Sequence, residues 1–192
     1  GNAFKRFYFN VFARRTLKAF DEIVAVSGHD AELFGKIVPR EKMCVIENGV
    51  DVKRFDVPAE KDENAFLFVG RFSENKRVDL LLETLLEALR EAPKTKLWLA
   101  GTDWNGALKE LKERVHALGL EGSVEFFEGL SNEDLNGLYA RAGHFVSASS
   151  YEGFGISLVE GMGAGCIPIV NGIDSFKKIV SHEKNGFIVD YN

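Results

Sequence analysis

Short apolar runs alternate with helical patterns along most of this chain, from Phe66 onward. Between the runs, apolar residues recur at spacings of three and four positions, which is the period of one buried helix face. Such patterns begin at Val78, Leu108 and Leu135, and Ser131 or Asn132 could cap the third helix. Six apolar runs have the length of buried strands: 66–69, 96–100, 124–127, 144–148, 167–170 and 186–189. These repeated strand–helix units predict an α/β domain with a Rossmann-like parallel sheet, covered by helices on both faces.

The first 56 residues follow a different order. The pattern predicts a helix over about 4–20, a strand over 22–26, a helix over 30–37 and a strand over 43–46. This αβαβ segment is too small to close a sheet by itself. Proline and charged residues cluster at 56–62, which favours a domain boundary there. We therefore predict one segment over 1–56 and a main domain over 57–192.

Two glutamates, Glu152 and Glu160, are separated by seven residues in the stretch YEGFGISLVEGMGAGCIPIV at 151–170. Glu152 adjoins a Gly-Phe-Gly turn, and Glu160 lies about two turns along the helix that follows. Glycines let a ligand approach backbone amides, and a helix N-terminus favours an anion or an electron-rich oxygen. Taken alone, the stretch could equally be a solvated connection between a strand and a helix.

The loop after the first strand of the main domain carries two cations, Arg71 and Lys76, five residues apart. It has the position of a phosphate-binding turn but lacks the G-x-G-x-x-G pattern. Arg71 can grip phosphate oxygens as a fork, and Lys76 can supply a point charge. The alternative is a solvated loop in which Lys76 pairs with Glu74. Because ligands of parallel sheets bind beyond the carboxyl ends of the strands, this loop and the glutamate motif together indicate a polyol and phosphate site.

The charge is distributed unevenly along the chain. Hydrophobic residues make up 45% and charged residues 28%, as in ordinary globular proteins, and the net charge is −5. Residues 1–20 contain five bases and no acid, so the remainder carries 29 acids against 19 bases. This balance argues against a nucleic-acid partner, which would require a basic face on the folded body. The basic start is also rich in aromatics and could lie on an anionic membrane, although packing on the protein's own sheet is the favoured alternative.

The cysteines and the apolar runs indicate the compartment. Cys44 and Cys166 lie far apart, and neither belongs to a C-x-x-C or Cys/His cluster. We therefore expect two buried thiols in a reducing environment and no metal site. No apolar run approaches the length that spans a bilayer, and no signal peptide opens the chain. We expect a cytoplasmic protein, with peripheral membrane association through residues 1–20 as an open alternative.

Six stretches together carry a family resemblance: EIVAVS (22–27), ENGVDVKRF (47–55), VGRFSENK (69–76), FFEGLSNEDLNGLYARAG (126–143), SASSYEGFGISLVEGMGAGCIPIVNG (147–172) and NGFIV (185–189). In this order and spacing they resemble the retaining, nucleotide-sugar-dependent glycosyltransferases of GT-B fold with an E-x7-E motif, the group 1 or family 4 type. The resemblance covers most of the chain from residue 21. It implies the donor-binding half of a GT-B enzyme, acting in polysaccharide or glycolipid biosynthesis, with residues 1–56 as the last part of the acceptor-side domain and a hinge.

The resemblance also implies roles for particular residues. Arg71 and Lys76 would neutralise the donor diphosphate in place of a metal ion, so neither a metal nor a cofactor is expected. Glu160 would accept hydrogen bonds from the ribose hydroxyls. Glu152 would be the catalytic group facing the donor sugar. Backbone amides of Gly153, Phe154 and Gly155 would lie near the sugar and phosphate, and the main chain at Leu130 would meet the base.

The chain departs from the family pattern at several points. Arg77 replaces a common glycine, and 172–175 reads Gly-Ile-Asp-Ser where a second glycine and a glutamate are frequent. The acceptor-side histidine and the closing helices after residue 192 are not represented. A fragment of a transferase should therefore bind a UDP- or GDP-sugar but transfer little to its sugar or lipid acceptor. The alternatives are a non-catalytic donor-binding subunit acting with a separate acceptor chain, and a GT-B-related sugar-nucleotide epimerase. An exposed apolar N-terminal segment could also form an oligomer.

Overall fold

The computed structural model describes residues 11, 12, 14–17, 19–55, 57 and 59–191. The chain divides into two compact units, Gly1–Gly49 (the first unit) and Val50–Asn192 (the main unit). From the sequence, residues 50–56 were expected to belong to the first segment. The 3₁₀ turn η3 (Val52–Phe55) instead packs against the main unit, because its Phe55 is buried in that unit's core.

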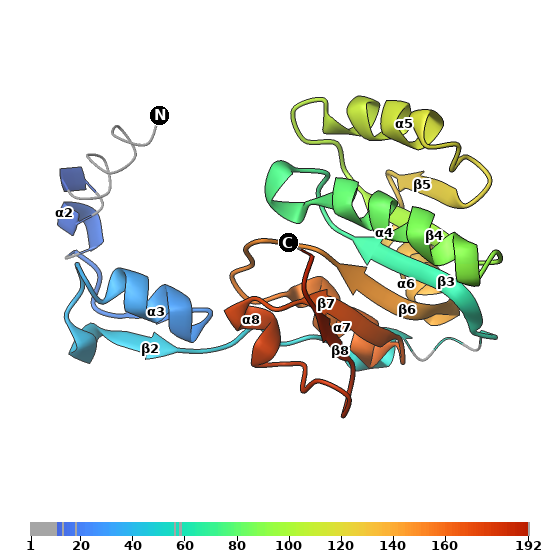
Figure 1. Ribbon diagram of the computed structural model, residues 1–192. Helices are drawn as coiled ribbons and strands as arrows, with labels where there is room; N and C mark the ends of the chain where they lie inside the picture. The colour runs from blue at the N-terminus through green and yellow to red at the C-terminus, as the bar shows by residue number, and fades with distance from the viewer. Residues whose placement is uncertain (1–10, 13, 18, 56, 58, 192) are drawn as a thin grey trace. The chain divides into compact units, whose positions relative to one another are not determined.

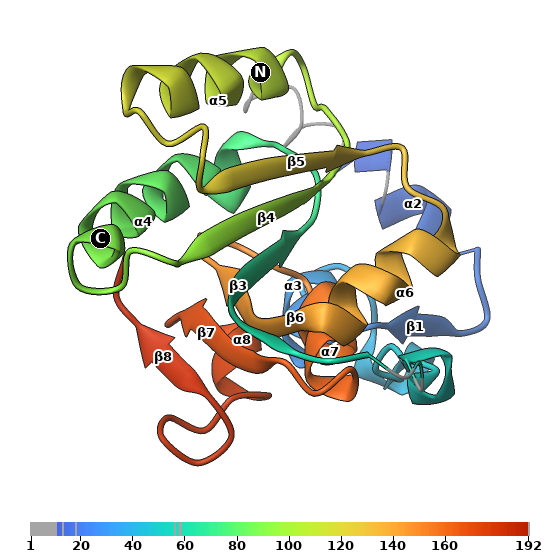
Figure 2. The ribbon, with the colours of Figure 1, turned by 90° about the vertical axis from the view of Figure 1, so that its right-hand side faces the viewer.

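Six parallel strands form the sheet of the main unit, in the order β5-β4-β3-β6-β7-β8 (Figures 1 and 2). Their bounds are β3 (Asp62–Val69), β4 (Lys96–Gly101), β5 (Val124–Glu128), β6 (Ala142–Ser147), β7 (Ile167–Asn171) and β8 (Phe187–Val189). From β3 the chain adds strands in one direction, and from β6 it adds them in the other. The order therefore reverses between β3 and β6, which makes their carboxyl ends the topological switch point of the sheet.

Helices cover both faces of this sheet, as the sequence predicted (Figure 2). On one face lie α4 (Val78–Glu91) and α5 (Ala107–Ala117), and on the other lie α6 (Asn132–Arg141), α7 (Ile156–Gly163) and α8 (Asp174–Lys177). Successive strand residues point to opposite faces, so Phe68 joins the core under α4 whereas Leu67 joins the core under α6. Burial on both faces explains why these strands read as continuous apolar runs rather than alternating ones.

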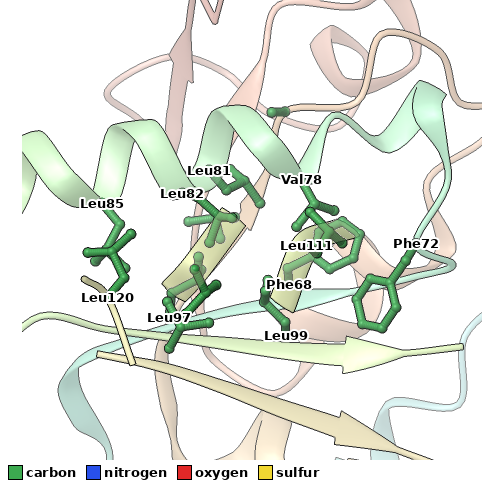
Figure 3. Packing of buried hydrophobic residues seen from close by; sticks show 14 of the residues in the cluster. Phe68, Phe72, Val78, Leu81, Leu82, Leu85, Leu97, Leu99, Leu111 and Leu120 are labelled. Carbon is green, nitrogen blue, oxygen red and sulfur yellow. The ribbon is translucent and has the colours of Figure 1, made fainter. Parts of the chain in front are cut away.

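In the helix α4, the apolar residues that recur at helical spacing in the sequence are the ones that pack against the sheet. Val78, Leu81, Leu82 and Leu85 are buried, and Figure 3 shows several of their side chains directed at the strands. Each fully buried leucine contributes roughly 1.5–3 kcal/mol through removal of apolar surface from water. Arg77 precedes α4 with φ 51° and ψ 45°, in the left-handed region. This conformation explains why glycine suits the position, and Arg77 Nη2 donates to the carbonyl of Tyr191 at 2.7 Å.

The predicted strands and helices of the main domain are confirmed, with shifts at their ends. β3 begins four residues before the predicted run, because Asp62, Glu63 and Asn64 extend the strand without an apolar signal. At α6, Ser131 is the cap: the amide of Asp134 donates to Ser131 Oγ at 3.1 Å. Fixing this cap places the preceding residue, Leu130, at the end of the β5–α6 loop.

The first unit contains a two-stranded parallel sheet and short helices. Its elements are α2 (Arg14–Leu17), β1 (Ile23–Ala25), α3 (Gly28–Phe34), η2 (Arg40–Lys42) and β2 (Met43–Val45). The helix α3 packs on both strands and is capped by Ser27, which accepts from the amide of Asp30. Several apolar side chains of this unit are exposed: Val24, Val26, Leu33, Val45 and Ile46.

The predictions about the N-terminal segment and the cysteines have different outcomes. Most of the helix predicted over 4–20 lies outside the described residues, so its membrane role stays a prediction. Within the part of the chain that the structure describes, no helix is long and apolar enough to cross a bilayer. Both cysteines are free thiols; Cys166 is buried as expected, whereas Cys44 is only half-buried. Burial raises the pKa of the Cys166 thiol, which keeps it protonated.

Candidate functional site

The two sequence motifs meet at the switch point between β3 and β6. Lys76 ends the 3₁₀ turn η4 (Glu74–Lys76) after β3, and Glu152 lies in the loop between β6 and α7. Lys76 Nζ lies 2.5 Å from Glu152 Oε1, and the side chains are only 13% and 14% exposed. The predicted alternative, a solvated pairing of Lys76 with Glu74, is therefore not the contact that forms. A largely desolvated cation and carboxylate stand together at the edge where parallel sheets bind ligands.

A group of hydroxyl and amide side chains fixes Glu152. Ser149 Oγ donates to Glu152 Oε1 at 2.9 Å and lies 3.0 Å from Ser147 Oγ. Asn171 Nδ2 donates to the carbonyl of Ser149 at 3.0 Å. Because these groups are buried and hydrogen-bonded, the carboxylate is held in one orientation before any ligand arrives.

Backbone and side-chain hydrogen bonds join the two loops that carry Lys76 and Glu152. The amide of Ser150 donates to the carbonyl of Asn75 at 2.9 Å, and Asn75 Nδ2 donates to the carbonyl of Tyr151 at 3.3 Å. Asn75 and Ser149 lie in stretches that carry the family resemblance, but the sequence predicted no role for either. The run SASS after β6 was the available signal, since small hydroxyl side chains next to a glutamate can orient it.

The helix α7 begins beside Glu152. Gly155 is its N-cap with φ 101°, in the left-handed region, and a Cβ there would lie 2.9 Å from the ring of Phe176. Only glycine satisfies both constraints without strain. The first turn of α7 contains no acidic residue, and its N-cap, Gly155, offers no side chain to accept from the leading amides. Gly153 and Phe154 are half-buried in the same loop, so the predicted backbone contacts surround one helix N-terminus.

Glu160 lies on α7 and is held by two residues for which the sequence analysis had no role. Tyr139 of α6 donates its hydroxyl to Glu160 Oε2 at 2.9 Å, and Arg54 Nη2 donates to Glu160 Oε1. Burial, followed by the charge of Glu160, raises the pKa of Tyr139 far above its usual range. The tyrosine therefore remains a neutral donor. Arg54 belongs to the motif ENGVDVKRF, but a lone arginine next to a phenylalanine gave no indication of its partner.

Arg71 and Leu130, the two remaining predicted residues, lie elsewhere along the same edge. The guanidinium of Arg71 stacks on the indole of Trp104, 4.6 Å from the ring centroid. Trp104 belongs to the loop after β4 and is 48% exposed. Arg71 is thus engaged by a contact other than the Lys76–Glu152 pair. Leu130 follows β5, is half-buried and packs on the core under α6, so its main chain lies at the carboxyl edge.

A switch point that carries a lysine, a carboxylate and an open helix N-terminus is typical of α/β proteins that bind phosphate-containing ligands. Residues 50–192 match the family model described as "Glycosyl transferases group 1". The chain belongs to this family of glycosyl transferases. The GT-B-type fold and the family predicted from the sequence are therefore confirmed.

Curated relatives and solved structures agree with this placement. The chain is 34% identical over 97% of its length to the GDP-mannose:cellobiosyl-diphosphopolyprenol alpha-mannosyltransferase of Xanthomonas oryzae pv. oryzae, of which it covers 49%. It is 34% identical to the protein of the same name from Komagataeibacter xylinus, of which it covers 47%. The chain thus spans about half the length of the curated relatives it matches. Anabaena HepE, solved with UDP and glucose, superimposes with a TM-score of 0.77 at 23% identity, covering 88% of this chain and 49% of HepE.

Proposed function

We propose that the main unit is the donor-binding domain of a retaining, metal-independent mannosyltransferase that takes mannose from GDP-mannose. The acceptor in this proposal is a saccharide linked through diphosphate to a polyprenol. Relatives at 34% identity are named GDP-mannose:cellobiosyl-diphosphopolyprenol alpha-mannosyltransferases, which supports both assignments. Those relatives are about twice as long as this chain, and the proposal assigns acceptor binding to their additional part.

The observation that carries this proposal is the Lys76–Glu152 pair at the switch point. In the proposal, the donor diphosphate takes Lys76 as its counter-ion, and Arg71 leaves Trp104 to join it. A fixed cation in a desolvated site stabilises the negative charge that develops on the departing nucleoside diphosphate. Glu152 then faces the sugar and stabilises positive character at the anomeric carbon. Because Ser149 holds Glu152 in place, the carboxylate keeps its position when Lys76 changes partner.

The other predicted residues bind the remaining parts of the donor in this proposal. The open N-terminus of α7, at Gly153, Phe154 and Gly155, supplies amides to the phosphate and sugar. Glu160 accepts from the ribose hydroxyls. The main chain at Leu130 meets the base, which explains why base recognition leaves no side-chain pattern in the sequence.

The role of Glu152 can be tested by comparing GDP with GDP-mannose in calorimetric titrations. We expect Glu152→Ala to weaken GDP-mannose by at least about tenfold relative to wild type, because a charge-assisted contact to the sugar is lost. Plain GDP should be affected much less. Glu87→Ala removes a carboxylate whose partner is Arg90 on the exposed side of α4, and it serves as the control. An equal loss for both ligands in Glu152→Ala would contradict the assignment.

A further inference from the structure

Glu160 belongs to a closed group of four side chains from three elements. Arg54 and Phe55 are consecutive residues of η3, Tyr139 lies on α6 and Glu160 lies on α7. Arg54 contacts Glu160, and its guanidinium also lies 4.6 Å from the ring centroid of Phe55. The Phe55 ring meets Tyr139 edge-on at 5.4 Å, and Tyr139 donates to Glu160 at 2.9 Å. Each member of this group therefore contacts two others.

Each oxygen of the Glu160 carboxylate accepts one hydrogen bond from a supporting side chain. Arg54 donates to Oε1 and Tyr139 donates to Oε2. A carboxylate has about four lone-pair positions, two on each oxygen. Among the described residues, these donors number one for each oxygen, which leaves acceptor capacity on both. Two acceptor positions side by side in one plane match two adjacent hydroxyl groups, such as the 2′- and 3′-hydroxyls of a ribose.

Burial of the surrounding side chains restricts the orientation of the Glu160 carboxylate. Phe55 is 6% exposed, Tyr139 is fully buried and the Glu160 side chain is 14% exposed. The buried Tyr139 hydroxyl lies 2.9 Å from Glu160 Oε2 and 3.3 Å from the carbonyl oxygen of Ser157, and the shorter contact, to the charged carboxylate, is the stronger one. The Arg54 side chain is 36% exposed, but its stem and guanidinium are held over the ring of Phe55. The carboxylate is thus oriented in the free protein, and binding does not have to order it.

We infer that Arg54 and Tyr139 are positioning residues that orient Glu160 to distinguish ribose from deoxyribose in the bound nucleotide. The inference rests on the proposed function, since it deepens the role assigned there to Glu160. It adds that selection for the sugar of the nucleotide depends on residues of η3 and α6, outside the loops that carry Lys76 and Glu152. Removing either support would let the carboxylate rotate, and the 2′-hydroxyl would lose its matched acceptor.

The test compares GDP with 2′-deoxy-GDP, and UDP with 2′-deoxy-UDP, in calorimetric titrations of the full chain. In wild type we expect the ribonucleotide to bind about tenfold more tightly, the value of one hydrogen bond to a charged group. In Arg54→Ala and Tyr139→Phe this preference should fall to less than about threefold, with ribonucleotide affinity lowered. Arg54→Lys should restore part of it. Arg90→Ala, which removes an exposed arginine of α4, should leave the preference unchanged.

The outcomes separate this inference from the proposed function. If Glu160→Ala abolishes the preference but Arg54→Ala and Tyr139→Phe keep it in full, the positioning role is wrong and the proposed function stands. If wild type binds GDP without preferring it to 2′-deoxy-GDP, the inference is contradicted and donor binding stands; if it binds none of the nucleotides, both are contradicted. Circular dichroism melts establish that each variant is folded. Should Arg54→Ala fail to fold, Tyr139→Phe decides the question, because it keeps the buried ring and removes only the hydroxyl.

Discussion

At the scale of single residues, Lys76 and Glu152 make the contact on which the account depends. Both side chains are largely buried, yet neither belongs to the apolar cores on the two faces of the sheet. Desolvating two charges costs several kcal/mol per ion, and a pair in this position contributes little net stability compared with apolar residues of similar size. The presence of this pair at the switch point is therefore better explained by ligand binding than by folding.

Substitution of Lys76 tests how much this side chain contributes to the affinity for GDP. We expect Lys76→Ala to weaken GDP by about 1.5–3 kcal/mol, the range for a hydrogen bond to a charged group. Calorimetric titration in the presence of EDTA gives the affinity directly. Lys109→Ala, which removes an exposed lysine of α5, is the matched control. Unchanged GDP affinity in Lys76→Ala would contradict the phosphate assignment.

His144 on β6 should make the free energy of unfolding depend on pH. Its Nδ1 atom is buried without a hydrogen-bond partner among the described residues, and its ring stacks on Phe66 at 4.4 Å. Desolvation lowers the pKa of His144 below its ordinary value of 6.5, although the charge of Glu63 partly offsets this. The unfolded chain therefore takes up a proton at a higher pH than the folded chain does. Stability from this group is present above about pH 6.5 and is lost as the pH falls below that value.

Urea unfolding at pH 7.5 and pH 5.5 tests this effect. Wild type should lose more free energy of unfolding between the two pH values than His144→Gln, because glutamine does not titrate. The free energy of unfolding should fall with urea concentration at the same rate in both proteins. Equal slopes would mean that both proteins expose the same surface on unfolding. Equal losses in wild type and variant would show that His144 does not carry the effect.

At the scale of elements, the start of α7 combines a backbone requirement with a packing requirement. We expect Gly155→Ala to lower the free energy of unfolding by more than about 1 kcal/mol, because φ 101° is unfavourable for alanine and the added Cβ would meet Phe176. Gly137→Ala is the control within α6, where a Cβ meets open space. That change should leave stability unchanged or raise it by up to about 1 kcal/mol. Thermal unfolding of both variants gives the comparison.

Local patterns were sufficient to predict the elements of the main unit, but not all of their contacts. The leucine spacing of α4 and the hydroxyl at Ser131 act within one element, so they are visible in the sequence. The support of Glu160 by Arg54, 106 positions away, depends on how η3 packs against α7. The stacking of Arg71 on Trp104 likewise joins two loops. Long-range pairs of this kind leave no periodic signal, which is why the sequence predicted the glutamate and not its partners.

At the scale of the whole molecule, the division into units follows where apolar side chains are buried. The cluster of proline and charge at 56–62 suggested a boundary, whereas the contacts divide after Gly49. Phe55 explains the difference, since its burial ties residues 50–55 to α6 and α7. The family match begins at residue 50 as well. The turn that supports Glu160 therefore belongs to the same compact unit as the site.

The measurement that tests the central claim most directly is a calorimetric titration of this chain with GDP, UDP and ADP in the presence of EDTA. The account predicts that GDP binds without a divalent metal, that ADP binds more weakly, and that added magnesium does not tighten GDP binding. It attributes this behaviour to the cations at Lys76 and Arg71. Absence of binding by all three nucleotides, or binding only after magnesium is added, would contradict it.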